Sequence, residues 1–124
     1  MADVVTTAMI DQTPAAPTDI DTFFACDLRV ATVLACEPNA KARKPAYKLT
    51  LDCGALGIKT SSAQITERYT PAELIGKQVI AVINFPARKV AAVLSKCLVL
   101  AVDSPTGLVT LSVDQPVENG LRIY

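Results

Sequence analysis

The sequence predicts an all-β protein built on a small closed barrel. Three observations support this fold class: five or six short segments rich in β-branched residues, turn residues between those segments, and one short capped helix after the third. Strand periodicity alone does not separate one kind of small barrel from another. The position of the helix is therefore the deciding feature.

The first two strands are predicted at residues 27–37 and 46–53. The first, DLRVATVLACE, is rich in β-branched residues and is stopped by Pro38. The second, AYKLTLDC, alternates apolar and polar side chains, which is typical of a half-buried strand. Its apolar face carries Tyr47, Leu49 and Leu51.

The third segment leads into the helix. Residues 54–57 turn the chain into IKTSSAQI (58–65). Thr70 and Glu73 then fit a Thr-x-x-Glu capping box, and Gly76 follows after one or two helical turns. The OB-fold, a five-stranded Greek-key barrel, has its helix between the third and fourth strands. We therefore predict an OB-fold with one short helix after the third strand.

Three further strand-like segments follow, at residues 78–85, 89–102 and 108–113. They are expected to complete the barrel and to add C-terminal strands, with a turn at DSPTG (103–107). Residues 1–20 are rich in Thr, Ala, Pro and Asp and predict a flexible or extended arm. The barrel domain is accordingly expected over residues 21–124.

Length and composition narrow the class of protein. A chain of 124 residues accommodates one domain, and its 51% hydrophobic residues predict a folded core. The longest apolar runs, such as CLVLAV, are far shorter than the roughly 20 residues that span a bilayer. Residues 1–28 contain no Lys or Arg, so no export or mitochondrial leader is expected. The expected location is the cytoplasm.

The sequence offers little support for catalysis. Its four cysteines form no CxxC pair, and histidine is absent, so neither a metal site nor a Cys–His nucleophile is expected. There is also no glycine-rich phosphate loop before a long helix. We therefore predict a protein that is not an enzyme and needs no cofactor.

Charge is unevenly distributed along the chain. The formal net charge is zero, yet residues 28–96 hold eleven basic and four acidic residues, whereas residues 1–27 hold five acidic residues and no basic one. The central segment can therefore present a basic face on a neutral protein. Charges that only solvate different surfaces would explain the same distribution equally well.

Four stretches resemble a known family: DLRVATV, ARKPAYKLTLDCG, GIKTSSAQITERYTPAELIGKQVIAVINFPARKV and LSKCLVLA. They are similar to CsaA-type export-related chaperones of the tRNA-binding-domain family, whose OB-fold is also appended to methionyl- and phenylalanyl-tRNA synthetases. The resemblance runs from about Phe23 to Tyr124. It implies an OB-fold with extra C-terminal strands, a homodimer, tRNA as a partner, and binding of unfolded or exported polypeptides.

The chain departs from the family pattern at small residues. Ala31 stands where the family commonly has a glycine that bends the first strand. Ala87, Ala91 and Ala92 stand where it tends to have Pro, Gly and Pro. Because Gly and Pro supply backbone angles or rigidity that Ala lacks, the sequence leaves the conformation of loop 86–93 open.

The candidate tRNA-binding residues combine cations with uncharged hydrogen-bonding side chains. The third OB strand commonly lies on the nucleic-acid-binding face, and mixed hydroxyl, amide and basic groups suit structured RNA. Taken alone, serines at a strand exit more often satisfy backbone groups, but the family resemblance reverses that preference. The candidates are Lys41, Arg43, Lys44, Lys48, Lys59, Ser61, Ser62, Gln64, Asn84, Arg88, Lys89 and Ser95.

Three functions remain open at this point. Only six aromatic residues are present, and Tyr47 is expected in the core, which favours an RNA binder that reads charge and shape over one that stacks many bases. The alternative is a peptide-binding chaperone without physiological tRNA binding, which the apolar composition and the expected arm would suit. The third is an assembly module with neither activity.

Overall fold

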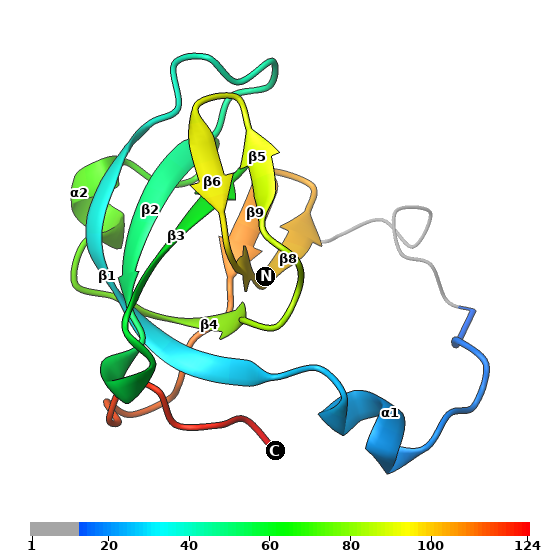
Figure 1. Ribbon diagram of the computed structural model, residues 1–124. Coiled ribbons are helices and arrows are strands. Elements are labelled where there is room, and N and C mark those ends of the chain that lie inside the picture. The colour runs from blue at the N-terminus through cyan, green and yellow to red at the C-terminus, as the bar shows by residue number, and fades with distance from the viewer. Residues whose placement is uncertain (1–12) are drawn as a thin grey trace.

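The computed structural model describes residues 13–124, and the statements below concern that part of the chain. Residues 1–12, most of the expected arm, lie outside it. The described chain begins with exposed residues of no regular structure and enters a short helix, α1 (Ile20–Phe24), that the sequence did not predict. The Asp19 carboxylate caps α1 by accepting a hydrogen bond of 2.8 Å from the main-chain nitrogen of Thr22. Figure 1 shows that α1 stands to one side of the barrel.

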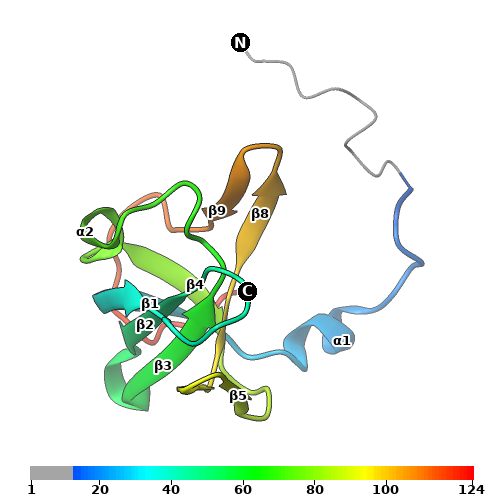
Figure 2. The ribbon, with the colours of Figure 1, turned by 90° about the horizontal axis from the view of Figure 1, so that it is seen from above.

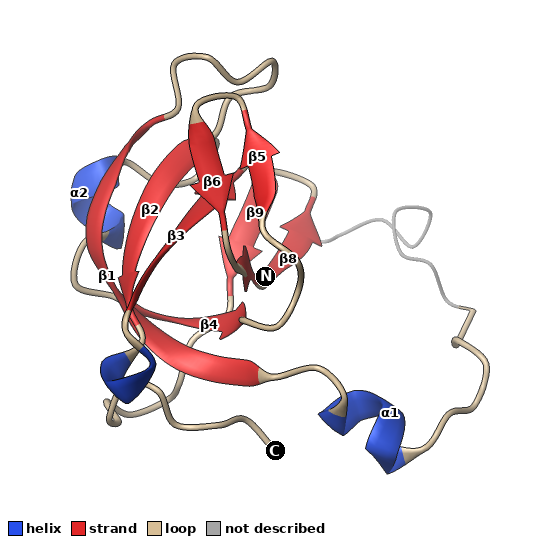
Figure 3. Cartoon of the chain, in the orientation of Figure 1, coloured by secondary structure: helices blue, strands red, loops and turns tan. Residues whose placement is uncertain are grey.

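Five antiparallel strands form the main sheet, in the order β3-β2-β1-β4-β7. Their bounds are β1 (Leu28–Pro38), β2 (Tyr47–Asp52), β3 (Ile58–Ala63), β4 (Gln78–Val82) and β7 (Leu98–Val99). The sheet curls on itself (Figures 1 and 3). As a result, β3 and β7 approach each other. The predicted all-β barrel is confirmed.

The long first strand makes the curl possible. Its first half pairs with β4, its second half pairs with β2, and the register shifts between Val33 and Ala35. Such a bulge bends a strand and increases its twist. Ala31, where the family commonly has glycine, is fully buried opposite Val79, so the bend lies beyond it.

The core follows the predicted alternation of β2. Tyr47, Leu49 and Leu51 are all buried, and the Tyr47 hydroxyl donates a hydrogen bond of 2.7 Å to the main-chain oxygen of Tyr69. Helix α2 (Pro71–Leu74) lies between β3 and β4, as predicted, and brings the fully buried Leu74 into this core. The predicted capping box of Thr70 and Glu73 is present.

The prediction of one long strand at residues 89–102 was wrong. The chain instead forms β5 (Arg88–Val90), β6 (Val93–Ser95), β7 and β8 (Ala101–Ser104). Strands β5 and β6 make a tight hairpin because Ala91 adopts a left-handed backbone with φ of 56°. The apolar run hid this reversal, because two alanines carry no turn signal. A second hairpin, of β8 and β9 (Gly107–Thr110), projects from the barrel in Figure 2.

The last residues of the chain return to the start of β1. The main-chain nitrogens of Gly120 and Ile123 donate to the oxygens of Val30 and Leu28, at 2.7 and 2.9 Å. This segment covers a second apolar cluster on the outer side of β1 and β4. The expected C-terminal additions to the barrel are therefore a hairpin and an extended segment.

The cysteines serve as small apolar residues. All four are free, and Cys36, Cys53 and Cys97 are buried. Burial raises the pKa of the Cys36 and Cys97 thiols to about 11, which leaves both protonated at neutral pH. In the described residues, none of the helices has the length and apolar character needed to cross a membrane.

Candidate nucleic-acid interface

Two segments far apart in the sequence meet at one end of the barrel. The loop between β1 and β2 lies beside the β5–β6 hairpin (Figure 1). Asn39 joins them: it is buried, and its side-chain Nδ2 donates a hydrogen bond of 3.1 Å to the main-chain oxygen of Val90. Its main-chain nitrogen also donates to Ala46 at 2.9 Å, which closes the loop. Asn39 was not among the predicted site residues, although its place after Pro38 is a turn signal.

The two segments enclose a basic pocket of about 500 Å³. Among the described residues that line it, five are cationic and none is acidic. The predicted residues that it brings together are Lys41, Arg43, Lys44, Gln64, Arg88 and Lys89. Hydrogen-bonded pairing of the two segments thus converts two short basic runs into one positive surface.

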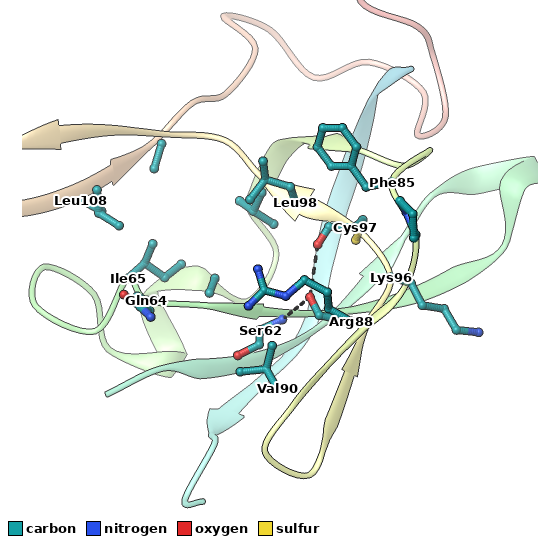
Figure 4. A pocket seen from close by; sticks show the side chains of 15 residues that line it. Ser62, Gln64, Ile65, Phe85, Arg88, Val90, Lys96, Cys97, Leu98 and Leu108 are labelled. Atoms are coloured by element: carbon teal, nitrogen blue, oxygen red, sulfur yellow. Dashed lines mark hydrogen bonds between the residues drawn. The ribbon is translucent and has the colours of Figure 1, made fainter. Parts of the chain in front are cut away.

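An apolar groove of about 490 Å³ adjoins the basic pocket, and Gln64, Arg88 and Val90 line both. Its walls come from β3, the β4–β5 loop, β5, β6, β7 and the second hairpin. Figure 4 shows the side chains that line it. The Arg88 side chain lies across the groove, whereas Lys96 points away from it (Figure 4). Phe85, which is 47% exposed, stands at the rim near Leu98. Phe85 was also not predicted as a site residue.

Three of the predicted serines lie where the barrel closes. The Ser61 side chain is buried, and its hydroxyl donates a hydrogen bond of 2.8 Å to the main-chain oxygen of Cys97. The Ser95 hydroxyl accepts a hydrogen bond of 3.0 Å from the main-chain nitrogen of Ser62. The main-chain nitrogen of Lys96 donates a hydrogen bond of 2.8 Å to the main-chain oxygen of Thr60. We call these contacts the seam. Both hydroxyls bind the backbone here: the buried Ser61 hydroxyl is closed to a ligand, whereas Ser95 is half-buried and lines the groove.

Ser62 and Gln64 differ from the other two. Ser62 contributes its main-chain nitrogen to the seam, while its hydroxyl has no hydrogen-bond partner in the described residues. The exposed Gln64 amide likewise has none, and it lines the basic pocket and the groove. These two side chains are available to a ligand.

The remaining predicted residues lie outside the basic pocket. Lys48 pairs with Glu37 at 3.7 Å and stands opposite Ser62 in the sheet. Lys59 shares the inward face of β3 with Ser61. Asn84 fixes α1 to the barrel, because its amide accepts from the main-chain nitrogen of Asp27 at 2.9 Å and donates to the oxygen of Ala25 at 2.8 Å.

The basic surface ends at a third depression, of about 560 Å³, beside the β8–β9 hairpin. Here Glu67 and Asp103 lie with Lys44, so two acidic side chains and one basic side chain line the depression beyond Gln64. The described residues contain no group of three or more His, Cys, Asp or Glu side chains that would hold a metal ion. The geometry instead suits an extended anion that follows the cations.

Comparison with known proteins assigns the domain. Residues 28–122 match the family described as "Putative tRNA binding domain". The chain belongs to the tRNA-binding-domain family. This membership agrees with the resemblance seen in the sequence.

Solved structures of the tRNA-binding-domain family share the whole fold. The chaperone CsaA from Bacillus anthracis is 44% identical, with a TM-score of 0.82 over 88% of this chain and 100% of that one. CsaA from Picrophilus torridus is 38% identical, with a TM-score of 0.83 over 87% and 100%. The predicted OB-type barrel and the predicted CsaA resemblance are thereby confirmed.

Other relatives carry the domain within a longer chain. The methionine–tRNA ligase of Chlorobium chlorochromatii is 43% identical over 102 residues, which are 82% of this chain and 14% of the ligase. That of Bacillus subtilis is 38% identical over 104 residues, 84% of this chain and 15% of the ligase. The chain thus spans about one seventh of the length of these enzymes.

Proposed function

We propose that this protein binds tRNA through the basic pocket and acts, as a homodimer in the cytoplasm, as a CsaA-like export-related chaperone. One observation carries the tRNA proposal: loop 41–44 and the β5–β6 hairpin bring five cations together with Gln64, and none of the described residues that line the pocket is acidic. Membership of the tRNA-binding-domain family supports the same partner.

The arrangement suits a folded RNA. Lys and Arg side chains neutralise phosphates and release counterions, which supplies most of the affinity for a nucleic acid without base readout. The free Ser62 hydroxyl and Gln64 amide lie at the edge of the cations and can contact sugar hydroxyls or base edges. The proposed interface is smaller than the predicted set, because five of the predicted residues have other contacts or positions: Lys48, Lys59, Ser61, Asn84 and Ser95.

Binding of bulk tRNA across a salt series tests the proposal. We expect Lys41→Ala/Arg43→Ala/Lys44→Ala to weaken binding and to make the slope of log affinity against log salt shallower by about 2–3, since each phosphate contact contributes roughly 0.7–0.9. The control Lys59→Ala/Arg68→Ala/Lys77→Ala removes the same charge from residues that do not line the pocket. Equal effects of both triple variants would show that total charge, and not the pocket, determines tRNA binding. Absence of binding at low salt would reject tRNA as the partner.

The homodimer is supported by apolar residues exposed around α1. Ile20 and Phe23 are 66% and 40% exposed, and Tyr124 of the C-terminal segment is 89% exposed. The rings of Phe24 and Tyr124 lie 5.9 Å apart, so these residues share one patch. We expect Phe23→Asp to shift the mass measured by analytical ultracentrifugation from dimer to monomer. A wild-type protein that sediments as a monomer at high concentration contradicts the homodimer.

A peptide-binding chaperone without physiological tRNA binding is the second candidate. Exposed apolar residues in the groove, among them Phe85 and Leu98, favour it. Binding of an unfolded polypeptide through apolar contacts should change little with salt, whereas tRNA binding should weaken steeply. Suppression of aggregation by the chain, with no measurable affinity for tRNA, would make this candidate the function.

A further inference from the structure

The apolar groove and the basic pocket form one continuous surface. Gln64, Arg88 and Val90 line both depressions, so the groove directly adjoins the cations. Strand register fixes this continuity, because Arg88 stands opposite Ser95 in the β5–β6 hairpin and Ser95 is tied to Ser62 at the seam. The groove is thus held in place by the same contacts that close the barrel.

The groove has apolar walls and a few polar groups. Its apolar residues include Ile65, Leu98 and Leu108, and Phe85 stands at the rim with its ring partly exposed. The Ser62 hydroxyl and the Gln64 amide line it without hydrogen-bond partners in the described residues. Its volume of about 490 Å³ lies within the usual range of small-ligand sites, about 300–1,000 Å³.

We propose that this groove binds an unstacked base from a single-stranded stretch of RNA, whose neighbouring phosphates lie on the basic pocket. The base packs against Phe85 and the apolar walls, and its polar edge meets Gln64 and Ser62. This proposal rests on the proposed tRNA binding and adds base contacts to a surface otherwise expected to read charge and shape.

Charge and chemistry favour a nucleotide over a peptide. The five cations beside the groove match a ligand with regularly spaced negative charges, which a general polypeptide lacks. A nucleobase has two apolar faces and one hydrogen-bonding edge, and the groove offers both kinds of partner. The Arg88 guanidinium lies across the groove, where its plane can stack on a base while its charge reaches a phosphate (Figure 4).

The absence of tryptophan allows a direct test. In Phe85→Trp the new indole is the only tryptophan in the chain, so its emission reports the groove alone. We expect a short oligouridylate, which has little stacking of its own, to quench this emission on binding. An abasic oligonucleotide of equal length, which keeps the phosphates, is expected to bind without quenching. Phe23→Trp, on α1 outside the groove, is the matched control and is expected not to be quenched.

Affinity gives a second, independent measurement. Phe85→Leu keeps an apolar side chain and removes the ring, and we expect it to weaken oligouridylate binding about tenfold while leaving abasic binding and the salt slope unchanged. Phe85→Tyr keeps the ring and is expected to bind as the wild type does. About half of the Phe85 side chain is exposed, and both variants keep a large apolar side chain there, so we expect little change in stability, which thermal unfolding of each variant checks.

The outcomes distinguish the proposed base site from the proposed tRNA binding on which it rests. Suppose that tRNA binding depends on the basic pocket, but oligouridylate does not quench Phe85→Trp and binds Phe85→Leu as tightly as the wild type. The base site is then overturned and the tRNA proposal stands. If Phe85→Leu weakens binding of an unfolded polypeptide and leaves oligouridylate binding intact, the groove is a peptide site. If the wild type binds no RNA at all, both proposals fail.

Discussion

The hydroxyl of Ser61 donates a hydrogen bond of 2.8 Å to the main-chain oxygen of Cys97, 36 residues further along the chain. This bond lies at the seam, where β3 and the chain around β7 approach without forming a regular strand ladder. A side chain here satisfies a backbone group that a closed ladder would otherwise satisfy. The polar stretch that resembled a ligand site therefore has a dual role, with Ser61 structural and Ser62 open to the groove.

Adjacent serines should consequently respond differently to substitution. Ser61→Ala removes a buried donor and is expected to lower the free energy of unfolding by about 1–3 kcal/mol, because the Cys97 carbonyl loses its better partner. Ser62→Ala removes a hydroxyl with no partner in the described residues and should change stability by less than about 0.5 kcal/mol. Urea unfolding of both variants measures the difference. Similar losses in the two would contradict the structural role of Ser61.

The left-handed Ala91 provides a stability test in the β5–β6 hairpin. An L-residue in this conformation costs about 1–2 kcal/mol, and glycine removes that cost while adding about 0.5–1 kcal/mol of unfolded-state entropy. We expect Ala91→Gly to stabilise the protein by about 0.5–1 kcal/mol in thermal or urea unfolding. Ala92→Gly, at a residue whose φ is not positive, should destabilise by a similar amount. A loss of stability in Ala91→Gly would speak against this turn conformation.

Asp27 should make stability depend on acid pH. Its carboxylate accepts from Arg29 Nε at 2.6 Å and lies 3.7 Å from Arg122 Nε, and the hydrogen bond from Arg29, with both positive charges, holds the pKa of Asp27 below its ordinary value. A depressed folded-state pKa adds stability above the unfolded-state pKa, near 4, and this stability is lost as pH falls through the folded value.

We therefore expect Asp27→Asn to cost about 1–2 kcal/mol at neutral pH and the difference from wild type to shrink below about pH 4. Urea unfolding at a series of pH values measures it. Asp114→Asn, which removes an exposed carboxylate with no ion pair in the described residues, is the matched control. A difference that persists unchanged at pH 2 would show that the charge of Asp27 is not responsible.

Gly54 marks a close approach of two backbone segments. Its φ is +63°, and a Cβ there would lie 2.1 Å from the main-chain oxygen of Asn119. Gly54→Ala must displace the C-terminal segment and is expected to cost more than about 3 kcal/mol. Gly76→Ala shares a positive φ, +90°, but meets nothing within 4 Å, so only about 1–2 kcal/mol is expected. Thermal unfolding compares them, and equal costs would argue against the close approach.

Much of the barrel was predictable because it depends on local patterns. The alternation around Leu49, the stop at Pro38 and the capping box of Thr70 each act within a few residues, and each appears as predicted. The hairpin at Ala91 was missed because its backbone angle leaves no mark in an alanine-rich apolar run. Helix α1 was missed because it is only five residues long, too short to give a clear helical pattern after its Asp19 cap.

By itself the sequence determined the strands of the barrel as far as β4, the place of the capped helix, the family, and which residues carry charge in the central segment. The tertiary structure decided which of those residues share a surface. Lys41 and Arg88 meet because Asn39 ties one loop to another, and Ser61 leaves the candidate interface because strand pairing turns it inward. Residue types and hydrophobic periodicity are local properties of the sequence. A binding surface depends on contacts between segments about 50 residues apart, and only closure of the barrel brings those segments together.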